Sequence, residues 1–292
     1  MTVQWFPGHM HKARKEIKKR LPDIDLIIEV MDARIPYSSE NPLVAQFRKD
    51  KPCIKILNKS DLADPVITQQ WLNYFELDEN TKALAVNAKT KGQIQSLPNA
   101  IKKFLPQRVK NEKPLRTFIL GIPNVGKSTI INILAGRTIA KVGDEPAVTK
   151  RQQQIYLKNN IILSDTPGIL WPRMENKNSG FRLGATGAIK DTAMDYEEVA
   201  LFIIEYLKKN YSENIISRYK LKTLPDNADA ILAEIGKKRG CLRAGGLVDV
   251  YQAADIFIKD IRSGALGNLS FETPEMIQSE IEKIESNKRQ QT

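Results

Sequence analysis

The sequence predicts an α/β fold, a doubly wound and mostly parallel sheet, followed by an all-helical domain. Short runs rich in β-branched residues alternate with helical segments over the first half of the chain, as in a sheet whose strands are buried on both faces. Beyond about residue 180 only helical periodicity remains. The length of 292 residues is about twice that of a domain of roughly 150 residues, which favours two domains.

Six short apolar runs are the predicted strands: 26–31, 53–57, 83–86, 117–120, and a hairpin of 154–157 and 161–164. Helical periodicity introduced by Asp64 and Pro65 separates the second run from the third, and proline fits the first turn of a helix. Residues 105–116 are polar and contain two prolines, which predicts a linker or crossover. This alternation is typical of a doubly wound α/β domain.

The last third of the chain carries three amphipathic patterns. Two predicted helical faces consist of Val199, Phe202, Ile203, Tyr206 and Leu207, and of Leu247, Val250, Tyr251, Ala254, Ile258 and Ile261. Thr273 and Pro274 introduce a last helix, with Ile277, Ile281 and Ile284 directed inward. We therefore divide the chain into a basic segment 1–22, an α/β domain 23–178, a helical domain 179–286 and a polar tail 287–292.

Composition restricts the possible classes of protein. Lys and Arg number 45 and Asp and Glu 34, so the net charge is +11 and the pI is near 9.5, which favours a polyanionic partner. No apolar run approaches the roughly 20 residues of a membrane helix, and the basic start lacks the apolar stretch of a signal peptide. Cys53 and Cys241 form no CxxC pair, so neither a disulfide framework nor a zinc site is indicated. A cytoplasmic protein without membrane attachment is expected.

A phosphate-binding pattern follows the fourth predicted strand. Residues 121–128 have the form GxxxxGK[ST] and precede a predicted helix. Glycines allow the backbone N–H groups to face a phosphate, Lys127 supplies a positive charge, and the Ser128 hydroxyl is suited to Mg²⁺. A glycine turn that merely caps a helix is the weaker interpretation. The nucleotide contacts predicted here are Asn124, Val125, Gly126, Lys127, Ser128 and Thr129.

Two further segments complete the predicted phosphate and metal site. Asp165-Thr-Pro-Gly168 follows a strand, where Asp165 can hold Mg²⁺ through water and the Gly168 N–H can meet a γ-phosphate. Thr149 lies in a loop without apolar periodicity, where it is either a switch residue that closes over the metal or an ordinary loop threonine. Lys127 and Gly168 are the residues expected to stabilise the reacting phosphate.

A guanine-recognition pattern follows two other strands. Asn58, Lys59, Ser60 and Asp61 form an NKxD sequence, in which the Asp61 carboxylate can accept from both N1–H and the 2-amino group of guanine. Such hydrogen-bonding sites reject the wrong partner by roughly 10⁴ or more. The stem of Lys59 can cover the base, and Val86 and Asn87 begin a segment that can donate a backbone N–H. A simple helix cap at NKSD is the alternative, which the position after a buried strand disfavours.

The order of these motifs is unusual, because the base motifs precede the phosphate and metal motifs. Together with Trp5-Phe-Pro-Gly-His-Met10, this order resembles the circularly permuted GTPases, most closely the ribosome biogenesis GTPase A family. Residues 236–249 and 262–267 are similar to the helical segment of that family. The resemblance implies a circularly permuted P-loop GTPase domain and a GTP-hydrolysing factor that matures the large ribosomal subunit.

The chemistry of hydrolysis needs a group beyond the phosphate site. Ile169 and Leu170 follow the DTPG segment and cannot orient water, so turnover without a partner should be slow. The resemblance implies a K⁺ ion held by the amide oxygen of Asn124, which otherwise only shapes the turn. His9 can position or deprotonate the attacking water, or it is a surface residue or partner contact.

Two basic clusters flank the predicted GTPase domain. The cations assigned to RNA binding are Lys12, Arg14, Lys15, Lys18 and Lys19, and Lys237, Lys238, Arg239 and Arg243. Solvated faces are the alternative, but the net charge favours folded rRNA recognised by shape and backbone. We expect a monomer that binds GTP, GDP and guanosine tetraphosphate, associates with large subunits in the GTP state and leaves after stimulated hydrolysis. The other functions considered are an RNA-binding chaperone in which hydrolysis is incidental and a switch for another partner.

Overall fold

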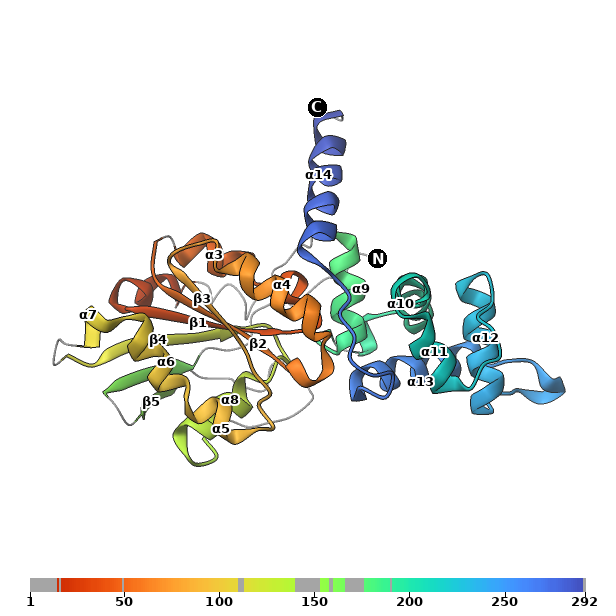
Figure 1. Cartoon of the computed structure of the whole chain (residues 1–292), viewed down its shortest axis with the longest axis horizontal. Helices are drawn as coiled ribbons and strands as arrows, with labels where there is room; N and C mark the ends of the chain where they lie inside the picture. The colour runs from red at the N-terminus through yellow and green to blue at the C-terminus, as the bar shows by residue number, and fades with distance from the viewer. Residues whose placement is uncertain are drawn as a thin grey trace.

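The structure is a computed structural model that describes residues 15, 17–48, 50–109, 113–139, 153–157, 160–165, 176–189 and 191–290. A sheet with flanking helices forms one half of the molecule, and helices from the last third of the chain form the other (Figure 1). Residues 264–273 lead from the helical half back to the sheet half (Figure 1).

The sheet has six strands in the order β3-β2-β1-β4-β6-β5. These strands are β1 (Leu26–Asp32), β2 (Cys53–Asn58), β3 (Thr81–Ala85), β4 (Leu115–Gly121), β5 (Gln153–Leu157) and β6 (Ile161–Asp165). Among the described strands of this sheet, only the β5–β6 pair is antiparallel, which is the predicted hairpin. The strand order reverses between β1 and β4, and in such sheets ligands bind at the carboxyl ends of the strands near that point. The predicted fold class is therefore confirmed.

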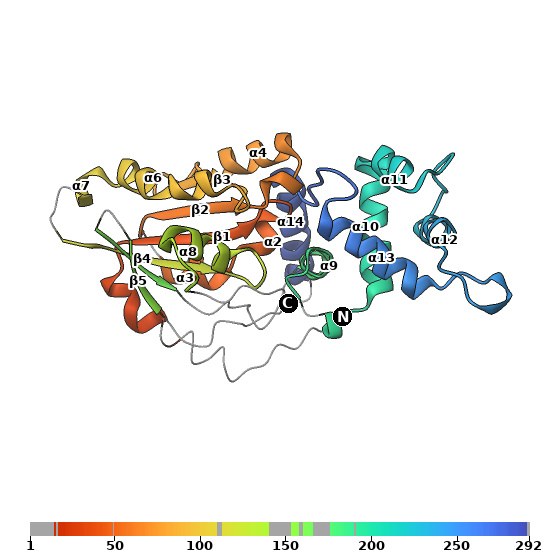
Figure 2. The same ribbon diagram turned by 90° about the horizontal axis from the view of Figure 1, so that it is seen from below.

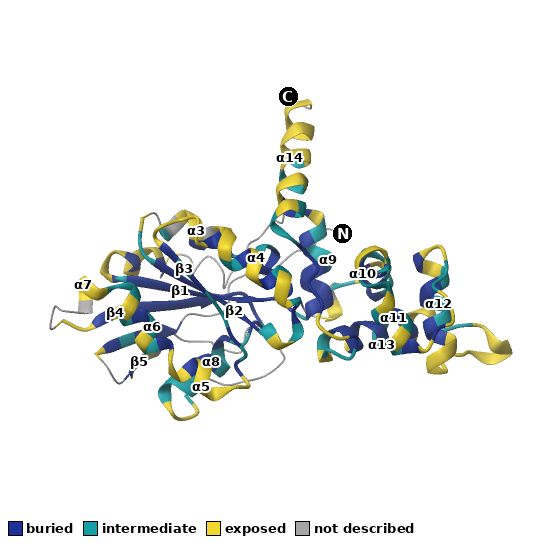
Figure 3. Ribbon diagram, in the orientation of Figure 1, coloured by how far each residue is buried: buried dark blue, intermediate teal, exposed yellow. Residues whose placement is uncertain are grey.

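Helices pack against both faces of the sheet (Figure 2). The helices of this half are α2 (Pro36–Ser39), α3 (Pro42–Arg48), α4 (Pro65–Phe75), α5 (Lys91–Gln95), α6 (Leu97–Phe104), the exposed α7 (Pro106–Val109) and α8 (Lys127–Ala135). On one face Ile28 and Val30 of β1 join the core that contains α5, α6 and α8. On the other, Met31 joins Trp71 and Phe75 of α4. Every residue of β1 and β2 is buried (Figure 3).

The start of α4 follows the predicted pattern closely. Asp64 is the N-cap, and its Oδ1 accepts from the N–H groups of Val66 at 2.8 Å and Ile67 at 3.3 Å. Pro65 occupies the first turn, where its missing N–H costs nothing. The predicted linker at 105–116 contains the short helix α7 and the first residues of β4.

The described residues after β6 form helices, with one isolated bridge between Leu242 and Val248. The helices are α9 (Lys177–Thr186), α10 (Tyr196–Asn210), α11 (Ser212–Tyr219), α12 (Ala228–Arg239), α13 (Val250–Ser263) and α14 (Pro274–Gln290). Val199, Ile203 and Leu207 of α10 are buried, as predicted. No helix in the described part of the chain is long and apolar enough to cross a membrane.

One predicted helical face is partly wrong. Leu247 and Tyr251 are 71% and 55% exposed, and Val250 is also exposed, whereas Ala254, Ile258 and Ile261 are buried. The apolar spacing continues through the glycine-rich turn before α13, but Asp249 caps the helix and Val250 is its first residue. Leu247 therefore precedes the helix, and the face that packs against the core begins later.

The last helix packs against α4 of the sheet half and is also bonded to α9 of the helical half. Ile277 is buried against Trp71, and Ile281 packs there partly buried, whereas Ile284 is only partly covered. Thr273 accepts from the Met276 N–H at 3.2 Å, as expected of an N-cap. The helix continues to Gln290, so part of the predicted polar tail is helical.

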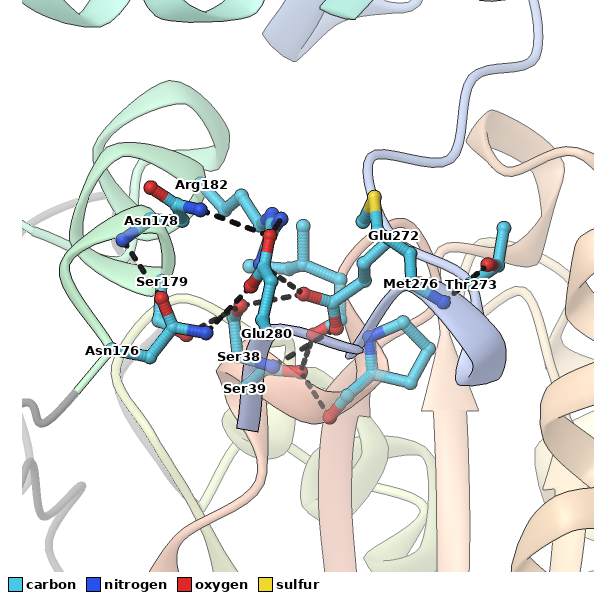
Figure 4. A network of polar contacts seen from close by, with 12 residues as sticks. Ser38, Ser39, Asn176, Asn178, Ser179, Arg182, Glu272, Thr273, Met276 and Glu280 are labelled. Carbon is cyan, nitrogen blue, oxygen red and sulfur yellow. Dashed lines mark hydrogen bonds and ion pairs between the residues drawn. The ribbon is translucent and has the colours of Figure 1, made fainter. Parts of the chain in front are cut away.

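A polar network joins the two halves (Figure 4). Arg182 of α9 donates to both oxygens of Glu280 of α14, at 3.0 and 2.6 Å. Its Nη1 is also 3.6 Å from Glu272, whose carboxylate accepts from the N–H and hydroxyl of Ser38. The side chains of Arg182 and Glu272 are buried, so the two halves are joined by ion pairs shielded from water.

Candidate functional site

The strand register brings the predicted motifs together at one edge of the sheet. Asp32 of β1 is paired with Asn58 of β2, Leu57 with Ala85 of β3, and Ile119 of β4 with Asp165 of β6. Consequently the segments that follow β2, β3 and β4 begin at the same end of the parallel strands, beside Asp165. We call residues 58–64, where the sequence predicts guanine recognition, the guanine loop, and residues 121–128, where it predicts phosphate binding, the phosphate loop.

The phosphate loop approaches β1 so closely that glycine is required. A Cβ atom at Gly121 would lie 2.5 Å from the carbonyl oxygen of Val30. Gly126 has φ +92°, and a Cβ there would lie 2.2 Å from Nδ2 of Asn58. Helix α8 starts immediately afterwards at Lys127, so its unpaired N–H groups and the positive end of its dipole lie at the loop.

Lys127 of the phosphate loop and Asp165 at the end of β6 form a buried pair. Their Nζ and Oδ1 atoms are 3.5 Å apart, with 8% and 2% of the side chains exposed. Ser128, the next residue of α8, is half-buried. A serine hydroxyl and a nearby carboxylate fit Mg²⁺, which keeps several waters and binds through few protein oxygens together with phosphates. The described residues contain no group of three His, Cys, Asp or Glu side chains suited to a metal.

Asn58 connects the phosphate loop with the segment after β3. Its Nδ2 donates to the Val125 carbonyl at 2.7 Å, and its Oδ1 accepts from the Ala88 N–H at 3.0 Å. The side chain is buried, so each partner would lose its hydrogen bond without compensation from water if Asn58 were removed. The sequence pattern indicates a base contact at Asn58 but does not reveal this connecting role.

Lys59 is held by an ion pair that the sequence analysis did not predict. Lys59 has φ +60°, and its Nζ lies 3.0 Å from Oδ2 of Asp32 at the end of β1. Arg34 donates to both carboxylate oxygens of Asp32, at 2.9 and 2.8 Å. Burial alone would raise the pKa of Asp32, but Arg34 and Lys59 lower it well below its ordinary value. The sequence feature that could have indicated this arrangement is an aspartate and an arginine two residues apart, directly after a predicted buried strand.

Asp61 is partly exposed at the outer end of the guanine loop, where its Oδ2 lies 3.6 Å from Nζ of Lys89. The Ser60 N–H donates to the Val86 carbonyl at 3.1 Å, which attaches the guanine loop to the segment after β3. In that segment Asn87 donates its N–H to Gln93 at 2.8 Å. The Asp61 carboxylate thus stays accessible while the backbone around it is fixed.

The phosphate loop also contacts the helical half. Asn124 has φ +61°, and its Nδ2 donates to the carbonyl of Gly187 at 2.8 Å. Gly187 ends α9 in the left-handed conformation. Arg262 of α13 donates to the carbonyls of Gly184 and Ala185 at 2.8 and 3.3 Å, so the end of α9 that meets Asn124 is itself fixed.

Several predicted site residues lie outside the described residues. These are His9, Lys12 and Arg14 near the start, Thr149, and Gly168 of the DTPG segment. Their roles stay predictions.

Known proteins resemble this chain over nearly its whole length. Residues 116–234 match a family described as 50S ribosome-binding GTPase. Ribosome biogenesis GTPase A of Bacillus licheniformis is 46% identical, over 94% of this chain and 99% of that protein. The Priestia megaterium protein of the same name is 43% identical, over 94% and 98%. The chain belongs to the ribosome biogenesis GTPase A family.

A solved structure of the same type supports the assignment. The GNP-bound YlqF from T. maritima has a TM-score of 0.64 and 25% identity, and the match covers 91% of this chain and 99% of that one. The resemblance inferred from the motif order is therefore confirmed. The chain is a GTPase, and GTPases of this family use Mg²⁺.

The described cations of the two basic clusters are all exposed. They are Lys15, Lys18 and Lys19, and Lys237, Lys238, Arg239 and Arg243. Some have acidic partners, because Arg239 lies 3.1 Å from Asp260 and Arg243 lies 2.9 Å from Asp249. Leu242 and Leu247 are exposed in the same region as the second cluster, so this end of the helical half presents both charged and apolar side chains.

Proposed function

We propose that this GTPase acts in late maturation of the large ribosomal subunit, binds rRNA in the GTP state and is released after subunit-stimulated hydrolysis. The observation that carries the proposal is the junction at Asn58, which connects the guanine loop, the phosphate loop and the segment after β3. The matched family is described as 50S ribosome-binding, and the relatives are named ribosome biogenesis GTPases. Such assembly takes place in the cytoplasm, where we place this protein as a monomer.

In this proposal the guanine loop recognises the base. Asp61 accepts from N1–H and the 2-amino group, and the stem of Lys59 covers the ring, since its ammonium is held by Asp32. Phosphates are bound by the N–H groups of the phosphate loop and by Lys127. Guanosine tetraphosphate shares the base and 5′-diphosphate of GDP, so we expect it to compete for the site.

The metal site and the hydrolytic step follow from the same arrangement. Ser128, Asp165 through water, and Thr149 would hold Mg²⁺, which neutralises charge on the phosphates when bound. The amide of Asn124 is oriented by its bond to Gly187, and its oxygen would hold K⁺. His9 is proposed to position the attacking water, and Gly168 to meet the γ-phosphate.

The exposed cations of the helical half support an rRNA contact. Lys237, Lys238 and Arg239 end α12, and Arg243 follows in a glycine-rich turn. Backbone recognition by such a surface makes association fall with increasing salt concentration. We propose that this surface and Lys15, Lys18 and Lys19 face folded rRNA.

GTP turnover by the purified protein in potassium and in sodium buffer, with and without large ribosomal subunits, tests the proposal. Stimulation by immature subunits, greater in potassium and reduced in Asn124→Ala, is the expected result. Equal turnover with immature subunits, mature subunits, free rRNA and buffer would refute subunit sensing. Release from subunits that persists when hydrolysis is blocked would favour the RNA-binding chaperone instead.

A further inference from the structure

A segment of the helical half runs along the guanine loop and binds its backbone. We call residues 261–272, the end of α13 and the connection to α14, the brace segment. Asn268 Nδ2 donates to the carbonyls of Asp61 at 3.2 Å and Ala63 at 3.1 Å. Between these two, the carbonyl of Leu62 accepts from the Leu269 N–H at 2.9 Å.

The contact continues at the next residue of the guanine loop. The Asp64 N–H donates to the Ser270 hydroxyl at 3.2 Å. Four consecutive residues, 61–64, are therefore each bonded through the backbone to the brace segment. An isolated surface contact would not follow the loop residue by residue.

Both ends of the brace segment are fixed to the sheet half. Arg34 Nη1 donates to the Ile261 carbonyl at 3.2 Å, and the Arg34 carbonyl accepts from the Phe271 N–H at 2.9 Å. The buried Trp71 donates its Nε1–H to the Glu272 carbonyl at 3.0 Å. Arg34 is the same residue that holds Asp32, the partner of Lys59, so Arg34 contacts both the brace segment and the group that holds Lys59.

We infer that the brace segment sets guanine specificity and that Asn268 is the positioning residue which fixes the direction of Asp61. This inference rests on the proposed guanine site. The inference is based on the exposed side chain of Asn268, which donates to the carbonyls of the residues on both sides of Leu62.

The local chain alone does not fix Asp61. It lies in a single turn of 3-10 helix, Ser60–Leu62, without a side-chain cap. The Asp61 side chain is 29% exposed, so the peptide units on each side determine where its carboxylate points. Two hydrogen bonds to guanine need donor–acceptor distances near 2.9 Å, and a rotation of the turn would lengthen at least one of them.

The brace couples base recognition to docking of the helical half. If contact with the brace segment increases the affinity of the guanine loop for guanine, then bound guanine must strengthen that contact by the same factor. The helical half thereby detects the base as well as the phosphates, through residues remote from the phosphate loop.

The test compares GDP with inosine diphosphate, which lacks the 2-amino group, by calorimetric titration of the full chain. Asn268→Ala removes both hydrogen bonds, and Asn268→Asp removes the donors while keeping the shape. We expect the ratio of the Kd for inosine diphosphate to the Kd for GDP to fall about three- to tenfold in both variants. The matched control is Asn214→Ala, which loses a 2.7 Å bond to the Leu266 carbonyl of the brace segment but no bond to the guanine loop.

The outcomes separate this inference from the proposed site. A wild-type protein that does not distinguish the two nucleotides would refute the guanine site itself. An unchanged ratio in both Asn268 variants, or an equal loss of affinity for both nucleotides, would overturn the brace as a specificity determinant. If this ratio of Kd values fell equally in Asn214→Ala, the specific role of Asn268 would be overturned. A reduced ratio in the Asn268 variants alone is the supporting result.

Discussion

The two loops of the nucleotide site are held in different ways. The guanine loop is bonded at four consecutive residues, 61–64, to the brace segment, which lies about two hundred residues later in the sequence. The phosphate loop is shaped by its own backbone, with close approach at Gly121 and a positive φ at Gly126. Among the described residues, Asn124 of this loop is bonded to the helical half through the carbonyl of Gly187.

Because of this difference, the two loops should respond to different changes in the protein. A glycine-shaped loop keeps its form wherever the strand and helix beside it are folded. A loop held by hydrogen bonds to another part of the chain keeps its form only while the two parts are docked. We therefore expect disturbance of docking to affect base recognition before phosphate binding, and disturbance of the glycines to have the opposite order of effects.

The largest expected effect is on docking itself, in Arg182→Met. This change removes the guanidinium from two carboxylates, of which Glu272 is fully buried and Glu280 is half-buried. Breaking such a buried pair costs about 3–5 kcal/mol. The free energy of unfolding from urea titration should fall by that amount, and discrimination between GDP and inosine diphosphate should fall with it.

Arg289→Met is the matched control for that change. Arg289 lies 3.9 Å from Glu285 on the exposed part of α14, where an ion pair contributes about 0.5 kcal/mol or less. A loss in Arg182→Met no larger than in this control would show that the buried network does not hold the two halves together.

Gly126→Ala should weaken binding of both nucleotides by about a hundredfold, because a Cβ would lie 2.2 Å from Asn58 Nδ2 at a φ of +92°. The displaced Asn58 would release Val125 and Ala88 as well. Affinity for GDP and for inosine diphosphate should fall equally, as measured by displacement of a fluorescent nucleotide.

Gly136→Ala provides the comparison at the other end of α8. Gly136 also has a positive φ, +67°, but a Cβ there meets nothing within 4 Å. It should lower stability by about 1 kcal/mol and leave nucleotide affinity unchanged. Equal losses of affinity in the two variants would mean that strain in α8, and not the contact with Asn58, controls the phosphate loop.

Asn58→Ala removes the connection between the two loops and should have an intermediate effect. The carbonyl of Val125 and the N–H of Ala88 lose their partner in a buried position, at a cost of about 1–3 kcal/mol. Both stability and affinity for GDP should decrease. Asn73→Ala, which loses an exposed bond from Gln69, should change neither by more than about 0.5 kcal/mol. A wild-type GDP affinity in Asn58→Ala would refute the connecting role.

Much of this arrangement was predictable because its signals are local. Strand runs, the GxxxxGK[ST] sequence and NKSD each occupy a few adjacent residues, and parallel strands then bring their ends together without further information. The position of Pro65 and Asp64 predicted the start of α4 for the same reason. The glycines of the phosphate loop could be assigned because the backbone itself requires them.

The brace segment was not predictable, because no local pattern pairs Asn268 with Asp61 across 207 positions. The Asp32–Arg34 pair can be seen in the sequence at the end of a predicted strand. Its contacts with Lys59 and Ile261 cannot, because only folding brings these residues near. The error at Leu247 has the opposite cause. Its spacing matches a helix, and only the cap at Asp249 shows that the helix starts later.

The smallest expected effect is the acid titration of Asp260, next to the brace segment. Burial raises its pKa, but hydrogen bonds from Arg218 and Tyr219 and the charge of Arg239 outweigh burial, so the pKa lies below its ordinary value of 3.8. A carboxyl group with a lowered folded-state pKa stabilises the fold above the unfolded-state value and loses that contribution as the pH falls through the folded-state pKa.

Asp260→Asn should therefore lower the free energy of unfolding by about 1 kcal/mol near neutral pH, a modest value because its arginine partners are partly exposed. The difference from the wild type should stay constant from pH 7 to 5 and shrink below pH 3.8, as measured by urea titration at each pH. Asp255→Asn, which loses the exposed pair with Lys259, should differ little at any pH. A constant difference down to pH 3 would mean that the shape of the side chain stabilises the end of α13, and not its charge. The brace segment would then hold the guanine loop without the help of this carboxylate.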